Sequence, residues 1–294
     1  MCLALPHRRG WRLQLPEPAG PPETLFRRLR AAAAGAPVAF GIDCPLGLPR
    51  CYAAAHIAEA NFPAFLGALA ARPGFFEVAS TLAQVGPERP FYPARGVAGM
   101  TRLAHAAALG LATAAALSRA CDRATSERPA GAPLFWTLGA NQSGKAAIAA
   151  WRDLLIPALL GPEPPRLWPF EGPFLSLLQD GAVAVAETYP AEAMRHLGLR
   201  VTGSKRRQAD RAGYAAALSG AMARLGACAT AALQAALRDG FGDAANGEDK
   251  FDCVLGVLCV LGVLTGVRPD SVPDDFWVRT WEGWVLGQTS LPRN

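Results

Sequence analysis

The stretch of residues 38–49, VAFGIDCPLGLP, is the feature that most constrains the fold of this chain. Its first five residues form an uninterrupted apolar run, which is typical of a parallel strand buried on both faces. Asp43 ends the run, and the Pro and Gly residues that follow turn the chain away. Ligands of open α/β sheets bind at the carboxyl ends of the strands, so Asp43 is a candidate site residue. The alternative is that its side chain only caps the following turn.

A second apolar run, residues 182–188, predicts another strand that also ends in an acid, Glu187. Tyr189 and Pro190 follow, and we expect a helix over residues 191–197. Because the carboxyl ends of parallel strands meet at one edge of a sheet, Asp43 and Glu187 are expected to converge. The alternative is that Glu187 only caps the helix after Pro190.

Asp249 and Asp252 begin the last long apolar segment of the chain. They are three residues apart, so they share one face of the first turn of a helix predicted over residues 249–264. Acids also stabilise a helix N-terminus, which is the alternative explanation for this pair. Carboxylates that converge repel one another unless a cation neutralises them, and such oxygen ligands suit Mg²⁺ or Mn²⁺. Two ions about 4 Å apart would support phosphodiester hydrolysis.

The composition is that of a folded cytoplasmic protein. Of the 294 residues 51% are hydrophobic and 18% are charged, which excludes a disordered chain. The seven Cys residues form no CxxC pair, so we expect reduced thiols rather than a zinc site or disulfides. The longest apolar run, residues 253–267, is shorter than the roughly 20 residues that span a bilayer, so we expect a buried helix and no membrane partner. The net charge of +5 permits a nucleic-acid partner without requiring one.

The remaining segments predict a mixture of helices and short strands. Residues 2–15 read as a hairpin and residues 21–34 as a helix that begins at a Pro. The long stretch that follows Asp43 is Ala-rich and mainly helical, and its one expected strand is residues 134–138. Residues 204–237 predict one or two further helices.

Residues 139–145, GANQSGK, offer a rival function because they fit the phosphate-loop pattern GxxxxGK after a possible strand. A loop running from Gly139 to Lys145 would make the protein an NTPase or a kinase. Ala146 follows, however, where that loop needs a Ser or Thr hydroxyl for Mg²⁺. The simpler interpretation is a Gly-rich turn that enters a helix, with Lys145 solvated or near a bound phosphate.

Basic side chains supply a second alternative. Lys205, Arg206 and Arg207 lie at the start of a predicted helix, where they and Lys145 are candidate substrate-binding residues for phosphates. Such a run is more often a solvated helix face. A nucleic-acid-binding protein without catalysis therefore stays open beside the enzyme readings.

Four motifs together resemble domain of unknown function 429, a family that is itself predicted to be ribonuclease-H-like. They are residues 41–49 (GIDCPLGLP), 187–190 (ETYP), 247–252 (GEDKFD) and 282–284 (EGW), and residues 136–142, 167–170 and 204–207 extend the resemblance in the same order. The resemblance implies an α/β fold in which helices flank a ribonuclease-H-like mixed sheet. It implies a single domain over residues 1–294, with its core at about 1–50 and 181–294 and a large, mainly helical insertion at about 51–180.

The same resemblance implies a metal-dependent nuclease or phosphodiesterase that acts on nucleic acid or another phosphodiester. Asp43, Glu187 and Asp249 or Asp252 would be its catalytic and metal-binding residues, with Mg²⁺ or Mn²⁺ as the cofactor. The first strand of such a sheet carries a further acid, and residues 1–15 contain no Asp. This strand is therefore expected to be missing from the chain or to have lost its acid, and the activity is expected to be weak or absent.

Overall fold

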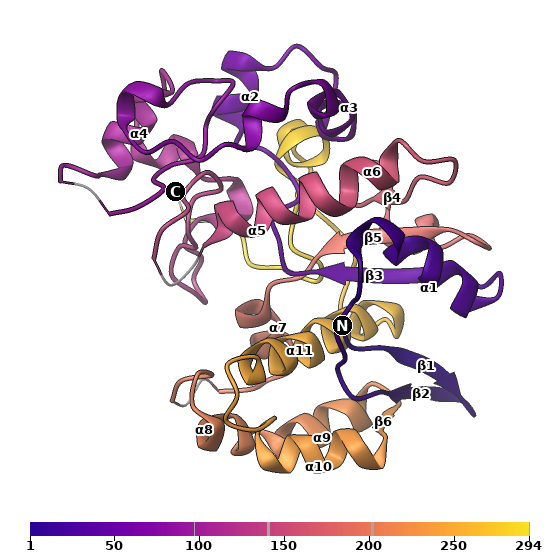
Figure 1. The fold of residues 1–294 in the computed structure, drawn as a ribbon. Helices are drawn as coiled ribbons and strands as arrows, with labels where there is room; N and C mark the ends of the chain where they lie inside the picture. Colours follow the sequence, from indigo (N-terminus) through magenta and orange to yellow (C-terminus); the bar gives the residue numbers. More distant parts are fainter. Residues whose placement is uncertain (97, 140–141, 201–202, 294) are drawn as a thin grey trace.

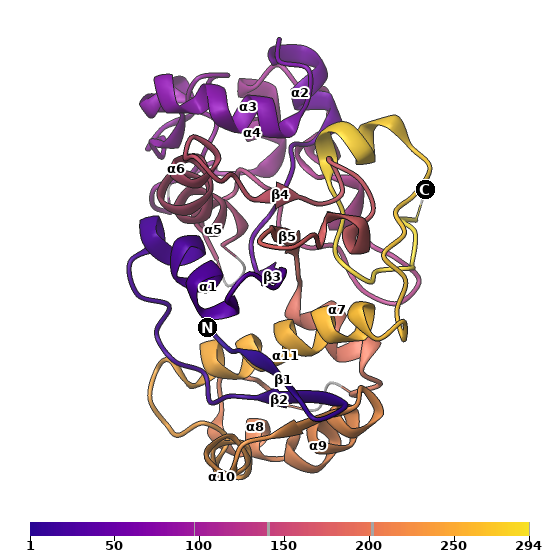
Figure 2. The same ribbon diagram turned by 90° about the vertical axis from the view of Figure 1, so that its right-hand side faces the viewer.

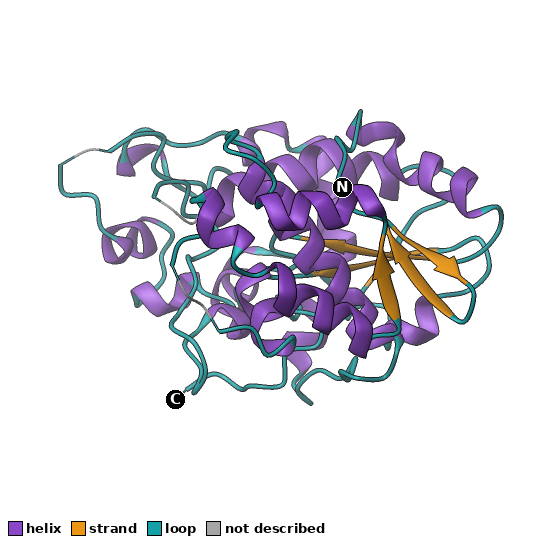
Figure 3. Cartoon of the chain, turned by 90° about the horizontal axis from the view of Figure 1, so that it is seen from below, coloured by secondary structure: helices purple, strands orange, loops and turns teal. Residues whose placement is uncertain are grey.

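The computed structural model describes residues 1–96, 98–139, 142–200 and 203–293. Two three-stranded sheets lie among layers of helices, with orders β3-β5-β4 and β1-β2-β6 (Figures 1 and 2). The predicted α/β class is confirmed. Seen from below, the strands gather toward one side of the molecule, and helices and loops fill the rest (Figure 3).

The helices and strands alternate irregularly along the chain, with short 3₁₀ and π segments between them. The first half of the chain contains β1 (Ala4–His7), β2 (Gly10–Leu13), α1 (Leu25–Ala33), β3 (Val38–Ile42), α2 (Arg50–His56), α3 (Phe62–Ala68), α4 (Arg102–Ala108) and α5 (Ser143–Ala149). The second half contains α6 (Ile156–Leu159), β4 (Arg166–Leu167), β5 (Val183–Glu187), α7 (Pro190–His196), α8 (Gln208–Ala212), α9 (Ala215–Arg224), β6 (Ala227–Ala229), α10 (Ala231–Asp239) and α11 (Gly247–Leu264).

The sheet β3-β5-β4 is parallel throughout, as the two apolar runs predict. Val38 lies opposite Val183 and Ile42 lies opposite Glu187, so β3 and β5 end at the same level. The side chains of β5 alternate between two hydrophobic clusters: Val183 and Val185 belong to one, and the alanines between and after them belong to the other. This register brings the residue after β3 next to the last residue of β5.

Helix α11 covers the face of this sheet that carries the alanines of β5. Gly41 in β3 is required by this close packing, because a Cβ there would lie 2.8 Å from methyl groups of Thr188 and Val260. The other side of α11, including Phe251 and Leu255, packs in a cluster with α7, α9 and α10. A helix that is apolar around most of its surface belongs in a core, so the predicted buried helix is confirmed.

The predicted hairpin is present, but it belongs to a separate sheet. β1 and β2 are antiparallel, and β2 pairs in parallel with β6 rather than with β3. Helix α11 lies between the two sheets (Figure 2) and uses apolar side chains on both of its sides. The single mixed sheet implied by the family resemblance is therefore divided in two.

The expected insertion, residues 51–180, holds helices α2 to α6 and packs on the main sheet. Phe62, Phe65 and Trp151 share one hydrophobic cluster with Val183 and Val185 of β5. This part of the chain is therefore built into the main core.

Two sequence-based expectations for local structure are wrong. Residues 134–138 form no strand, and Trp136 makes only an isolated bridge with Tyr92 because the surrounding chain turns. Residues 204–237 contain more than the one or two helices expected, with α8, α9 and β6 complete before α10 begins.

Among the described residues, no helix has both the length and the apolar character needed to cross a membrane.

Candidate active site

A cavity of about 360 Å³ lies at the carboxyl ends of β3 and β5. It is lined from several parts of the chain: by Asp43, Cys44 and Pro45 after β3, by Arg119, Cys121, Asp122, Arg128, Gly131 and Ala132, by Gln142, Ser143 and Ala146 around α5, by Glu187, Tyr189, Pro190 and Ala191, and by Lys205, Glu248, Asp252 and Val285. The cavity therefore contains an acid from each of the three motifs that the sequence singles out.

Asp43 is an acid of the cavity that has no polar partner among the described residues. Its side chain is exposed to the cavity, and it makes no hydrogen bond or ion pair with the described residues. Removal from bulk water raises the pKa of Asp43 to about 7; the charge of Asp252 and, less strongly, that of Glu187 act in the same direction, while Lys205 opposes them. An unpaired carboxyl with a raised pKa is suited to bind a cation or to exchange a proton.

Glu187 is buried and held by hydrogen bonds to both of its carboxylate oxygens. Arg119 donates from Nη1 to Oε2 at 2.6 Å and from Nη2 to Oε1 at 2.8 Å, and the backbone N–H of Leu46 donates to Oε2 at 2.8 Å. Arg119 also donates to Asp122, from Nε and Nη2 at 2.9 Å each. Burial raises the pKa of Glu187, and the charge of Arg119 acts against this rise. Two of the three donors that hold the Glu187 carboxylate therefore come from Arg119.

Asp252 projects from the second turn of α11 and is paired with Lys205. The Lys205 Nζ lies 2.6 Å from Oδ1 and 2.7 Å from Oδ2. Burial raises the pKa of Asp252, while the charge of Lys205 lowers it. The structure thus distinguishes the two acids of this motif, since Asp252 lines the cavity whereas Asp249 is exposed and does not.

The predicted basic residues are only partly brought to the cavity. Lys205 lines it, whereas Arg206 and Arg207 are exposed on the chain that follows. Lys145 is exposed and does not line it, although Ser143 and Ala146 of the same helix do.

The phosphate-loop pattern finds no support in the surrounding structure. Two of its residues, 140 and 141, lie outside the described residues, and the strand that such a loop requires is absent from residues 134–138. The hypothesis of an NTPase or kinase therefore lacks the strand on which it depended.

Arg119, Asp122 and Arg128 are the site residues that sequence reasoning missed. No motif or periodic pattern marks them, because the glutamates that Arg119 and Arg128 bind lie 68 and 64 residues later in the chain.

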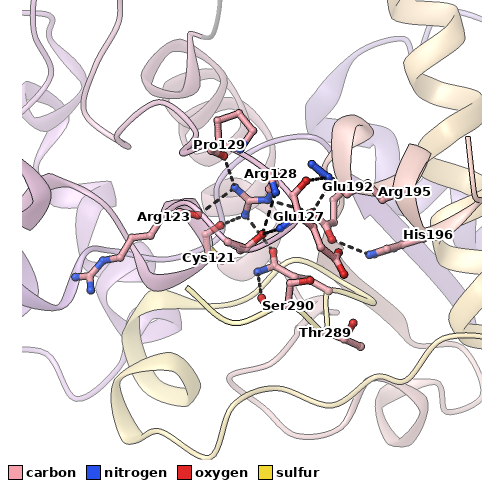
Figure 4. A network of polar contacts seen from close by, with 12 residues as sticks. Cys121, Arg123, Glu127, Arg128, Pro129, Glu192, Arg195, His196, Thr289 and Ser290 are labelled. Atoms are coloured by element: carbon pink, nitrogen blue, oxygen red, sulfur yellow. Dashed lines mark hydrogen bonds and ion pairs between the residues drawn. The ribbon is translucent and has the colours of Figure 1, made fainter. Parts of the chain in front are cut away.

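A second network of polar contacts fixes this loop beside the cavity (Figure 4). Arg128 donates from Nε to Glu192 Oε2 at 3.0 Å, and it also binds the backbone oxygen of Cys121. His196 Nε2 lies 3.1 Å from the other oxygen of Glu192. Burial raises the pKa of Glu192, but the bond from His196 and the charge of Arg128 outweigh it, so the pKa lies below its ordinary value. Helix α7 and the loop that carries Arg119 are thereby joined.

One group of three side chains among the described residues has ligand atoms close enough together to hold a metal ion. Ligand atoms of Cys121, Asp122 and Glu187 lie within 4.8 Å of one another. Both carboxylates of this group are bound to Arg119, and burial raises the pKa of the Cys121 thiol well above its ordinary value. A thiol that keeps its proton is a poor ligand, and the guanidinium already supplies the positive charge.

Asp43 and Asp252 line the same cavity and offer carboxylate oxygens alone. Carboxylate oxygens suit a hard cation such as Mg²⁺ or Mn²⁺. The cavity lining carries five carboxyl groups, Asp43, Asp122, Glu187, Glu248 and Asp252, against three basic side chains, Arg119, Arg128 and Lys205. This acidic excess favours a bound cation.

Comparisons of the chain with protein-family models, with curated proteins and with solved structures give no match.

Asp43 is expected to make the metal-free protein less stable as the pH rises from about 4 to about 7. In the unfolded chain its carboxyl loses its proton near pH 4, whereas in the folded protein its pKa is about 7. The folded state therefore binds more protons in this window, and raising the pH favours unfolding. Asp43→Asn removes this contribution, so the variant should melt above the wild type at pH 8, and the difference should shrink toward about pH 5. Thermal melts in EDTA measure this, and a difference that is the same at every pH would contradict it.

Proposed function

We propose that this protein is a divalent-metal-dependent phosphodiesterase of the ribonuclease-H-like type that acts on nucleic acid in the cytoplasm. The observation that carries the proposal is the unpaired carboxyl of Asp43, which shares one cavity with Glu187 and Asp252 at the ends of two parallel strands. Chemistry at this edge of the sheet is the rule for open α/β folds. The resemblance of the four motifs to domain of unknown function 429 points to the same residues.

The ribonuclease-H-like assignment is part of this proposal. It is supported by the parallel pair β3 and β5, each of which ends at an acid, and by α11, which brings a third acid to them. The hairpin β1-β2, which belongs to the other sheet, gives it no support.

Asp43 and Asp252 would hold one Mg²⁺ or Mn²⁺ ion in this proposal. A divalent ion supplies a Lewis acid for a phosphate oxygen and lowers the pKa of a bound water. Arg119 holds the carboxylates of Glu187 and Asp122 in place by ion pairs, so these charged side chains keep their positions in the cavity lining. Arg206 and Arg207, exposed beside Lys205, would contact the phosphates of a polyanionic substrate.

Metal binding and hydrolysis together test the proposal. Mn²⁺ or Mg²⁺ should raise the melting temperature, because a ligand that binds only the folded state stabilises it by about 2.7 kcal/mol at one hundred times its dissociation constant. The same ions should support hydrolysis of fluorogenic single-stranded RNA, single-stranded DNA or an RNA–DNA hybrid, and EDTA should stop it. Ca²⁺, which is larger, serves as the comparison ion.

If Mn²⁺ and Mg²⁺ neither stabilise the protein nor support hydrolysis, the proposal is wrong. Tight binding of nucleic acid that is independent of metal and leads to no cleavage would favour the non-catalytic alternative instead.

A further inference from the structure

Lys205 already occupies the oxygens that a cation would need on Asp252. Its ammonium contacts both Oδ1 and Oδ2, at 2.6 and 2.7 Å. Both side chains are only partly buried, with exposed fractions of 25% for Lys205 and 20% for Asp252. Because one ammonium engages both oxygens, a divalent ion that binds both oxygens from the same side must displace Lys205.

The backbone of Lys205 is held in place, whereas the polar contacts of its side chain with the described residues are all made by the terminal ammonium. Arg211 is buried and donates to the Lys205 carbonyl at 2.5 Å, and its other nitrogens bind the carbonyl oxygens of Gly240 and Gly242. The N–H of Ser204 binds Asp210 at 2.8 Å. The ammonium can therefore leave Asp252 by rotation of the Lys205 side chain, while the backbone of Lys205 stays beside the cavity.

We propose that Lys205 is an internal counter-cation that competes with the divalent ion for Asp252, so that metal binding releases its ammonium to bind a substrate phosphate. This inference rests on the proposed function and names the regulation of the same site. In the metal-free protein Lys205 reduces the repulsion between Asp252 and Asp43. Once the ion has taken over that role, the freed ammonium adds a positive charge at the cavity. Metal and phosphodiester should therefore bind cooperatively.

The chain permits a direct test because it contains only three lysines, Lys145, Lys205 and Lys250. The full-length protein is treated briefly with acetic anhydride, and the acetylation rate of each lysine is measured by peptide mass spectrometry with and without saturating Mn²⁺. Lys205 should react slowly without the ion and about fivefold faster or more with it, the low end of coupling between two sites. Lys145, which is exposed and outside the cavity, should react at the same rate in both conditions.

Calorimetry with Mn²⁺ gives a second readout. Lys205→Met should bind Mn²⁺ about fivefold tighter or more, because the competitor is gone, whereas Lys145→Met should bind it like the wild type. If the Lys205 variant does not fold, the acetylation of the wild-type protein decides alone.

The outcomes separate this inference from the proposed function. If the wild type binds Mn²⁺ but the acetylation of Lys205 is not faster, the inference is wrong and the proposed function stays in place. The same holds if the wild type binds Mn²⁺ and Lys205→Met binds it equally or more weakly. If neither the wild type nor Lys205→Met binds Mn²⁺, both the inference and the proposed function are wrong.

Discussion

Replacing Arg119 by Met is expected to lower the free energy of unfolding by about 3–5 kcal/mol, the typical cost of removing one partner of a buried ion pair. The Arg119 side chain is 1% exposed, and its guanidinium binds Asp122 and Glu187 at the same time. Without it, Glu187 would be a buried carboxylate that has only the N–H of Leu46 as a donor. Urea unfolding followed by circular dichroism measures the change.

Arg152→Met is the matched control for this prediction. Arg152 also pairs with an acid, Asp153, at 2.7 Å, but the two side chains are 55% and 40% exposed. Exposed pairs contribute about 0–1 kcal/mol, so this variant should unfold almost like the wild type. If the two substitutions lower the free energy of unfolding equally, the ion pairs of Arg119 with Asp122 and Glu187 do not stabilise the protein more than an exposed pair does.

Sequence reasoning is most successful where one short segment determines its own structure. The apolar runs before Asp43 and Glu187 predict two parallel strands, and both are present with the acids at matching ends. The reason is physical, since a continuous apolar run must be covered on both faces and a parallel sheet between helices is the usual solution. The register of the strands brings the two acids to the same end of the sheet.

Reasoning from local pattern is less successful where distant segments decide the outcome. The hairpin is readable in the sequence, but its partner β6 is a strand of three residues that lies more than 200 positions later in the chain. Nothing near residues 4–13 indicates that they pair there and that α11 separates them from β3. The choice between Asp249 and Asp252 likewise depends on how α11 is rotated against the sheet.

The cations of the site are its least predictable part. The sequence predicts that Lys205 binds phosphate, yet it is paired with Asp252, and Arg119 has no local signal at all. Acids predicted from strand ends therefore give an incomplete view of the cavity, because their net effect depends on which basic side chains fold against them. Among the described residues, two motif acids of the cavity, Asp43 and Glu248, have no such partner. Only Asp43 lies at the end of a strand with its pKa raised to about 7, which is why the second large effect is expected there.

Asp43→Asn is expected to reduce metal-dependent phosphodiester hydrolysis by about 10²-fold or more, the scale on which removal of one charge-stabilising group acts on catalysis. The amide keeps the shape of the side chain but loses the charge that would hold the cation. Because Asp43 has no partner among the described residues that would be left unpaired, the metal-free variant should be at least as stable as the wild type at pH 8, which separates loss of activity from loss of folding. Initial rates with saturating Mn²⁺ measure the effect.

Asp249→Asn is the control, since this acid belongs to the same motif as Asp252 but is exposed outside the cavity. The rate of this variant should stay within about twofold of the wild type. If hydrolysis survives both Asp43→Asn and Asp252→Asn, the reaction takes place in another part of the molecule, because the third converging acid, Glu187, is held by a buried arginine.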